Sequence, residues 1–467
     1  IWDSIYNFTG VGSTYTLGRW FLGYAGLITS MFDLPWVNGA FSLFYISIVV
    51  ILLTEMFEIK NKGMIVLCAA IFVSFPTVVS SFAYMYTADA YLLAFLLATL
   101  AVYLTWCVKK WGTIAGMVCL AFAMGIYQAY ATVAIVLVLL YIIRQFVIEK
   151  LDFLEAVRKD LKYLGMLVGG AVLYAVILKI TLIRYNITLP GYQGIGALGI
   201  MSLGQYKAAL QKTLYHFRLI LGMEHGVEKH VYSLLNAAAL LLIGLILIYL
   251  LVRNQVYKKK MSMLASIAAV CLIPVGAYFI NFTSPDVQYY TLMEMAVCLI
   301  YLLMIIMLLQ LDWKTWISKI LKGCGIFVLC GLVYYNVINC NIAYFNMNLS
   351  YHKSISIAED VLQRIEQMDE FQNQHDKVVI MGDYNCATEN LQIMMPSIMG
   401  ISNDSFLNDS YHYTIIWNYC FGVQMEQASY DEMMEIVETD EYKNMSVYPL
   451  KGCVEYINGI IVVKMQE

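Results

Sequence analysis

The chain has 467 residues, of which 61% are hydrophobic and only 13% are charged. A soluble domain carries about 45–50% apolar and about 25% charged residues, so this composition excludes a water-soluble enzyme and predicts several membrane spans. The net charge of -4 argues against nucleic acid as a partner, because that ligand needs a concentrated basic surface. The eleven cysteines form no CxxC pair and show no Cys/His ligand spacing, so no metal site is expected.

The polar segment 1–35 opens the chain and holds an acid, Asp3, and a cation, Arg19, among aromatic residues. On residue types alone, these two charges are expected to form a surface ion pair worth about 0–1 kcal/mol. The stretch Phe21–Phe32 is apolar but too short to span a membrane, so it is expected to lie along the interface or to dip into the bundle.

Ten apolar runs follow, each close to the roughly 20 residues that cross about 30 Å of hydrocarbon. The fourth and fifth runs are divided only by a short polar segment around Gln128. The predicted spans are 36–57, 63–82, 88–106, 112–126, 128–147, 162–183, 231–252, 261–281, 290–310 and 322–345.

The basic residues predict the orientation of these spans. One set of connecting loops holds sixteen Lys and Arg residues, whereas the opposite set holds six, although the loop 184–230 in that set is the longest. Basic loops stay on the cytoplasmic side, so the poorer set lies outside. Residue 1 then also lies outside, and we expect one further span before it. The predicted outer loops are 1–35, 83–88, 184–230 and 282–289.

Two outer segments place polar groups where spans begin. Tyr84 and Tyr86 precede Asp89, which either complements the dipole at a helix start or belongs to a site. Gln128 lies between two tyrosines in the tight turn Tyr127–Tyr130 and needs hydrogen-bond partners at membrane depth. Another helix or a ligand hydroxyl would supply these hydrogen-bond partners.

The other two outer segments carry charges. Asp286 lies in a loop, and Glu294 lies one turn into the next span, where it is neutral, paired or facing a wet cavity. The run 203–221 predicts an amphipathic helix with Lys207, Lys212 and Arg218 on its basic side, and Lys229 follows it. These cations either touch lipid headgroups or bind the phosphate of a lipid substrate.

Residues 346–467 predict a small extracytoplasmic α+β domain. Ser354–Phe371 has helical spacing, and Val378–Met381 and Ile460–Met465 are β-branched runs. The predicted fold is therefore mainly α: a polytopic helix bundle over residues 1–345, followed by this domain.

Five segments, in their order along the chain, resemble the bacterial type II glucosyltransferase-domain family, which is named for O-antigen glucosylation. These segments are Asp3–Asn7, Gly18–Phe21, Phe75–Asp89, Tyr127–Tyr130 and Ala343–Met347. The resemblance implies a GT-C-like bundle in the bacterial cell membrane. Its active site would lie on the outer face, under a first outer loop that carries an acid.

The resemblance also implies the reaction. A hexose, glucose by the family's name, passes from a polyprenyl-phosphate carrier to a cell-surface polysaccharide or glycolipid with inversion and without a cofactor. Asp3 would be the general base, and Arg19, with Arg218 and Lys229, would bind the lipid phosphate. The predicted substrate-binding residues are Trp2, Tyr6, Trp20, Tyr84, Tyr86, Asp89, Tyr127, Gln128, Tyr130, Asp286 and Glu294.

Proteins of other classes share some of these features. A transporter would place charges deep in several spans and break helices at matching points of two halves, whereas here only Glu294 is deep and no repeat is found. A flippase or ligase for the same lipid carrier differs only by the family resemblance.

Overall fold

The computed structural model describes residues 14–189, 199, 201–223, 231–372, 375–384, 407 and 409–466. These residues fall into two compact units, and the chain passes from one to the other between Cys340 and Asn341. The first unit is an all-helical bundle, and the second is built around a β-sheet.

The helices of the first unit follow the predicted apolar runs, and every predicted span is largely helical. Six helices among the described residues are long and apolar enough to cross a membrane. They are α3 (Pro35–Met56), α6 (Met85–Cys107), α8 with the short turn before it (Gln128–Val147), α9 (Phe153–Tyr185), α11 (Val231–Arg253) and α15 (Trp316–Glu366).

The remaining predicted spans are short or broken. Helices α4 (Lys62–Ser74) and α5 (Pro76–Phe82) meet at a 44° bend, because Pro76 lacks the N–H that would continue the helix. In the same way, Pro274 causes the break between α12 (Lys260–Cys271) and α13 (Ile273–Ala277). Helix α7 (Gly112–Ile126) is short, and α14 (Leu299–Leu309) begins only after two 3₁₀ turns, Thr291–Met293 and Met295–Cys298.

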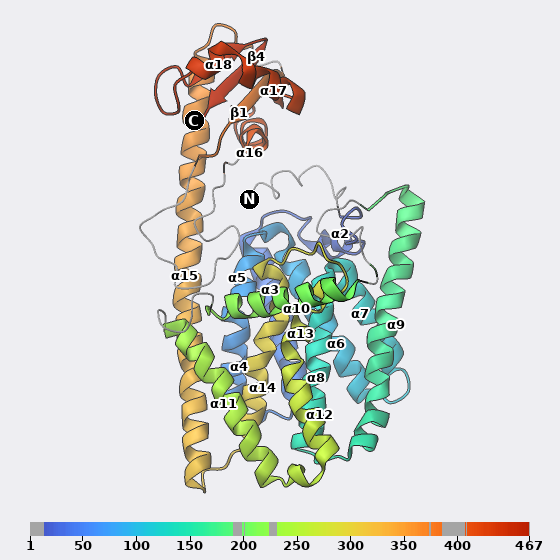
Figure 1. Ribbon diagram of the computed structural model, residues 1–467. Coiled ribbons are helices and arrows are strands. Elements are labelled where there is room, and N and C mark those ends of the chain that lie inside the picture. Colours follow the sequence, from blue (N-terminus) through green and yellow to red (C-terminus); the bar gives the residue numbers. More distant parts are fainter. Residues whose placement is uncertain are drawn as a thin grey trace. The chain divides into compact units, whose positions relative to one another are not determined.

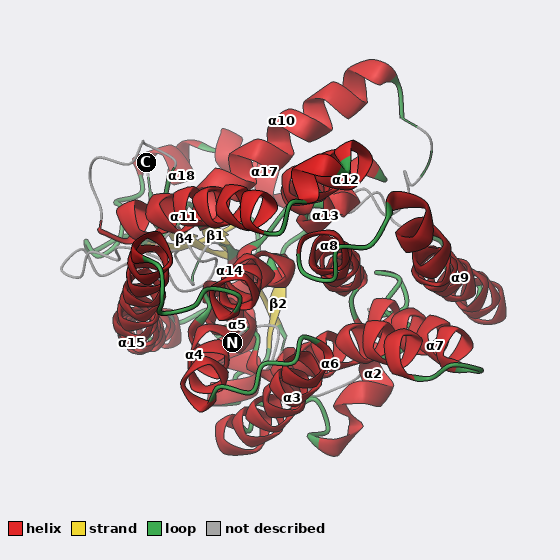
Figure 2. Cartoon of the chain, turned by 90° about the horizontal axis from the view of Figure 1, so that it is seen from below, coloured by secondary structure: helices red, strands yellow, loops and turns green. Residues whose placement is uncertain are grey.

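Helix α10 (Leu203–Ile220) lies across the bundle rather than along it (Figure 1), and it confirms the predicted helix in the long outer loop. Viewed along the bundle, α6, α8 and α14 are seen nearly end-on, whereas α10 is seen lengthwise (Figure 2). It packs against α13 and the 3₁₀ turn Phe279–Phe282. A short helix, α2 (Leu22–Ala25), packs against α6 and α7.

Helix α15 merges two predicted helices, the span 322–345 and the helix 354–371, into one element of 51 residues. The residues from 332 to 366 include no Gly or Pro that would end a helix. The separation expected between these two helices was therefore wrong.

The second unit has a four-stranded sheet of order β2-β1-β4-β3. Its central strands are parallel, and both faces are buried: Val378 and Ile380 of β1 belong to one apolar cluster, and Val379 and Met381 belong to the other. The two predicted strands are confirmed as β1 and β4. The elements are β1 (Asp376–Met381), α16 (Ser410–Ile415), β2 (Met425–Gln427), α17 (Tyr430–Glu438), α18 (Asp440–Asn444), β3 (Val454–Ile457) and β4 (Ile460–Lys464).

Candidate functional site

The loop before α2 is fixed in the break between α7 and α8. Gln128 Nε2 donates hydrogen bonds to the Leu17 carbonyl and to the Tyr174 hydroxyl, both at 2.9 Å, and Tyr174 donates to the Gly18 carbonyl at 3.0 Å. Gly18 has a φ of +71°, and a Cβ there would lie 2.7 Å from Gln128 Nε2. Gln128 therefore finds its partners within the chain, on the loop and on α9.

This loop holds the Arg19 side chain against two tyrosines. An Arg19 Nη donates to the Tyr91 hydroxyl at 3.2 Å, and the guanidinium lies over the Tyr127 ring, 4.3 Å from its centroid. The rings of Tyr91 and Tyr127 stack at 5.1 Å, and Tyr130 packs beside Tyr91 at 6.5 Å. The guanidinium is half-buried, and such a cation–π contact contributes roughly 0.5–2 kcal/mol. These contacts give the cation a fixed place at this end of the bundle.

Asp89, in the first turns of α6, is enclosed by neutral hydrogen-bond donors. Its carboxylate accepts hydrogen bonds from Thr29 Oγ1 and Asn38 Nδ2, both at 3.2 Å, and all three side chains are buried. Asn38 also caps the start of α3 by accepting from the Leu34 N–H. The observed contacts of Asp89 therefore join α6 to α3 and to the segment after α2.

Glu294 lies between the two 3₁₀ turns that precede α14. It is buried and accepts a 2.8 Å hydrogen bond from the Tyr278 hydroxyl. The Tyr278 ring packs against Tyr289 at 4.9 Å and stacks on His216 at 6.1 Å. Burial and the charge of Lys212 lower the pKa of His216, which favours a neutral imidazole at pH 7.

Helix α10 turns one cation inward. The Lys212 ammonium is half-buried and donates to the Val287 carbonyl; burial lowers the pKa of Lys212, and nearby Asp286 opposes that shift. Arg218, in the last turn of the same helix, is exposed, as is Asp286. The cation that α10 directs into the bundle is thus Lys212, which the sequence placed on its basic side together with Arg218.

The two polar clusters are neighbours. The electrostatic surroundings of the Tyr289 hydroxyl include both Tyr127 and Glu294. Both clusters lie where helices break: Tyr127 lies between α7 and α8, and Glu294 lies between the 3₁₀ turns before α14. Irregular backbone at membrane depth is tolerated where it is buried in protein or lines a wet cavity.

The other predicted site residues have different surroundings. Trp20 is buried and packs edge-to-face on Phe122 at 5.3 Å, next to Gly125, so its observed role is packing. Tyr84 and Tyr86 are half-buried around the start of α6. Four predicted residues lie outside the described residues: Trp2, Asp3, Tyr6 and Lys229.

Sequence reasoning missed several members of these clusters. Most are tyrosines, which in a chain with 36 of them cannot be told from ordinary residues of the membrane interface. Thr29 and Asn38 belong to no recognisable motif. Their only trace in the sequence is Asp89 itself, because a lone acid at the start of a span needs hydrogen-bond donors around it. The missed residues are Thr29, Asn38, Tyr91, Tyr174, His216, Tyr278 and Tyr289.

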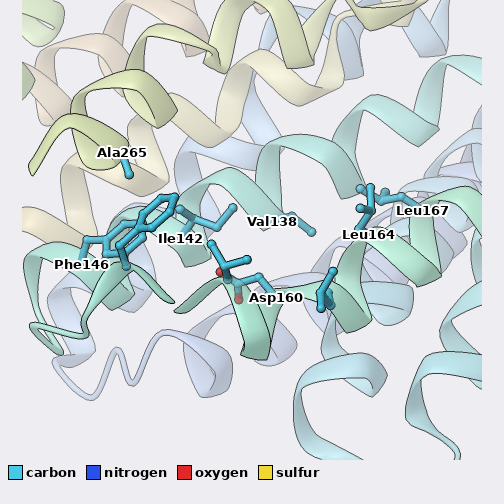
Figure 3. A pocket seen from close by; sticks show the side chains of 10 residues that line it. Val138, Ile142, Phe146, Asp160, Leu164, Leu167 and Ala265 are labelled. Carbon is cyan, nitrogen blue, oxygen red and sulfur yellow. The ribbon is translucent and has the colours of Figure 1, made fainter. Parts of the chain in front are cut away.

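A groove of about 340 Å³ between α8, α9 and α12 holds none of the predicted site residues. Figure 3 shows its apolar side chains, including Ile142 and Phe146, with Asp160 among them. Asp160 accepts a 3.1 Å hydrogen bond from Gln145. Phe146 follows Tyr130 by 16 residues of helix, about 24 Å, so this part of the groove is far from the tyrosine cluster. Within the described ranges, no group of three or more His, Cys, Asp and Glu could hold a metal ion.

Comparison with known proteins identifies the family. The family model described as Glucosyl transferase GtrII matches residues 2–293, more than half of the chain. The chain belongs to this family. The match confirms the resemblance and makes the protein a glucosyltransferase; it covers the Arg19 cluster and Lys212 and ends one residue before Glu294. None of the curated proteins and none of the solved structures matches the chain.

Proposed function

We propose that the protein transfers glucose from a polyprenyl-phosphate carrier to a cell-surface polysaccharide or glycolipid, on the outer face of the bacterial membrane and with inversion. The observation that carries the proposal is the placement of Arg19 in a chain of glucosyltransferase family. Its guanidinium is held over Tyr127 and against Tyr91 at the end of the bundle where the helices break.

The reaction needs one base and one cation. Asp3 would accept the proton of an acceptor hydroxyl as its oxygen attacks the anomeric carbon, and the bond from that carbon to the phosphate oxygen would break. Arg19 would bind the lipid phosphate and stabilise the charge that builds on its oxygens. Removing one such preorganised donor costs roughly 2.7–4 kcal/mol of barrier.

The other predicted residues have supporting roles in this proposal. Lys212 is a better placed second cation than Arg218, because it is directed inward, while Arg218 and Lys229 would attract the anionic carrier from the surface. Tyr127, Tyr130 and the more exposed Tyr84 and Tyr86 would line the sugar and the carrier. Trp2, Tyr6, Asp89, Gln128, Asp286 and Glu294 would complete the walls, with Trp20 packed behind Arg19.

The basic loops support the proposed sidedness. Arg144, Arg253 and Lys259 lie at the opposite helix ends, where they pair with Glu58, Asp312 and Asp152. Positive residues remain in the cytoplasm, so the Arg19 end, and with it the C-terminal unit, would face outward.

The test is transfer by the purified protein from a radiolabelled polyprenyl-phosphate glucose. We expect Asp3→Asn to reduce the transfer rate by a factor of 10² to 10⁴, and Arg19→Ala by about 10² to 10³. Arg253→Ala, which removes an exposed pair at the opposite end, is the matched control and should transfer at the wild-type rate. Wild-type rates in both site variants, or transfer from a nucleotide sugar alone, would refute the proposal.

A further inference from the structure

A second apolar groove, of about 440 Å³, lies in the seam between α11 and α15. Its walls include Leu241 and Leu242 of α11 and Cys324, Phe327 and Val328 of α15, and none of the described residues that line it is charged. Leu242 is 11 residues, about 16 Å, into α11, so this wall lies at mid-depth of that helix. A groove at this depth is surrounded by hydrocarbon and suits a lipid tail.

Polar groups lie above the groove on the same strip of α15. Asn339 follows Val328 by 11 residues, which is three helical turns and about 16 Å, so the two side chains share nearly one face. Between them, Gly331 lies close to Leu235 of α11: a Cβ at Gly331 would be 3.2 Å from that side chain. The next residue, Cys340, donates to the Ser74 carbonyl, so Asn339 is at the helix ends where α4 and α5 break.

Among the residues that the structure describes, Asn339 has no hydrogen-bond partner. Its side chain is 0% exposed, and neither its amide nitrogen nor its amide oxygen is bonded. The Oδ1 of Asn336, one turn before it, is also buried and unbonded. Buried polar groups are almost always paired, and an unpaired one destabilises the fold. The fully unbonded amide of Asn339, beside the unbonded Oδ1 of Asn336, therefore points to a bound molecule that supplies both donors and acceptors.

The chemistry of the seam selects the occupant. The tail must be apolar, and the head must be neutral because only amides, which carry no charge, are offered to it at this end of the groove. Hydroxyl groups both donate and accept, as the free amide requires. We propose that the α11–α15 seam binds a glycolipid, with its tail in the groove and its sugar hydroxyls on Asn339 and Asn336. This deepens the proposed function, on which it rests, by locating a lipid-linked acceptor or product.

The experiment uses the full chain in phosphatidylcholine nanodiscs and a dodecyl glucoside with a diazirine in its alkyl chain. After illumination, we expect the label on α11 and α15 peptides. Unlabelled dodecyl glucoside should compete for the site, whereas dodecyl phosphate, which has the same tail and a charged head, should not. Labelling spread over all lipid-facing helices, or equal competition by the phosphate, would overturn the proposal.

Two variants test the two ends of the site. Asn339→Leu should weaken probe binding roughly five- to tenfold, as expected for one or two lost hydrogen bonds. Gly323→Leu should remove labelling, because Gly323 lines the groove and a side chain there meets open space that it would fill. Gly165→Leu on α9, where a Cβ also meets open space, is the matched control and should label as wild type.

Thermal unfolding shows which variants are folded, and Asn336→Leu replaces Asn339→Leu if the latter does not fold. A higher unfolding temperature in Asn339→Leu with unchanged labelling would show that the unpaired amide only destabilises the fold and binds no ligand, which would overturn the proposal. Labelling needs no turnover. A chain that transfers no sugar but takes the probe would therefore refute only the proposed function, whereas an active chain without label in the seam would refute only this inference.

Discussion

Gly18 determines where the Arg19 side chain lies. Its positive φ lets the loop turn, and its lack of a Cβ lets the Gln128 amide and the Tyr174 hydroxyl reach the main chain of the loop. An L-residue with a side chain rarely adopts this backbone conformation. The position of the cation therefore depends on a neighbouring residue that has no side chain.

The first prediction concerns this glycine. Gly18→Ala should lower stability by more than about 1 kcal/mol, because the alanine is strained at this φ and its methyl group would displace Gln128 and Tyr174. Thermal unfolding in detergent measures the loss. The matched control, Gly244→Ala in α11, adds a methyl group in open space within a helix and should be neutral or slightly stabilising. Equal unfolding temperatures for Gly18→Ala and wild type would contradict the expected strain.

Among the elements, the amphipathic helix α10 is the one that presents Lys212 and His216 to the bundle. A capping box fixes its first turn: Ser202 Oγ accepts from the Gln205 N–H, and the Gln205 side chain accepts from the Ser202 N–H at 2.8 Å. A helix with so few buried residues depends on its cap more than a buried span does.

The second prediction follows from that cap. Ser202→Ala should destabilise α10 by about 1 kcal/mol, which corresponds to roughly fivefold faster hydrogen exchange of its amides. Mass spectrometry of α10 peptides measures the rate. Ser202→Asp retains an acceptor at the cap and should exchange at close to the wild-type rate. If Ser202→Ala also does so, the cap has no part in holding the helix.

For helices and strands, the sequence predicts that an element is present better than it predicts where the element begins and ends. Apolar length located helical structure in all ten predicted runs, and β-branched runs located β1 and β4, because burial on both sides is visible in composition. The strands β2 and β3, of three and four residues, carry too little signal. Breaks at Pro76 and Pro274 were within reach of the sequence, whereas the pairing of Gln128 with Tyr174 depends on a contact between residues 46 positions apart.

For the whole molecule, sidedness decides whether the site faces its proposed substrates. The distribution of Lys and Arg predicts the sidedness from the sequence, because loops rich in basic residues alternate with loops poor in them along the entire bundle. Two exposed cysteines can test this prediction: Cys107 at the end of α6, beside Lys109 and Lys110, and Cys420 in the C-terminal unit.

The third prediction uses these thiols. In sealed right-side-out vesicles, a membrane-impermeant maleimide should modify Cys420 at once and Cys107 only after the vesicles are opened, because the charge bias of the loops predicts that the two thiols lie on opposite faces of the membrane. Peptide mass spectrometry reads each site, and Cys420→Ser shows the background. Modification of Cys107 in sealed vesicles, with Cys420 protected, would invert the topology and place Arg19 in the cytoplasm.

The half-buried guanidinium of Arg19, covered by the Tyr127 ring, has a consequence for the surroundings in which the protein works. Dissolved ions screen exposed charges within about 8 Å at physiological ionic strength, but they act far less on a charge enclosed by aromatic rings. An anion held there would stay bound as salt rises, while attraction to surface residues such as Arg218 fades. In the proposed reaction that anion is the carrier phosphate, so its binding at Arg19 would depend less on salt concentration than its first attraction to the surface.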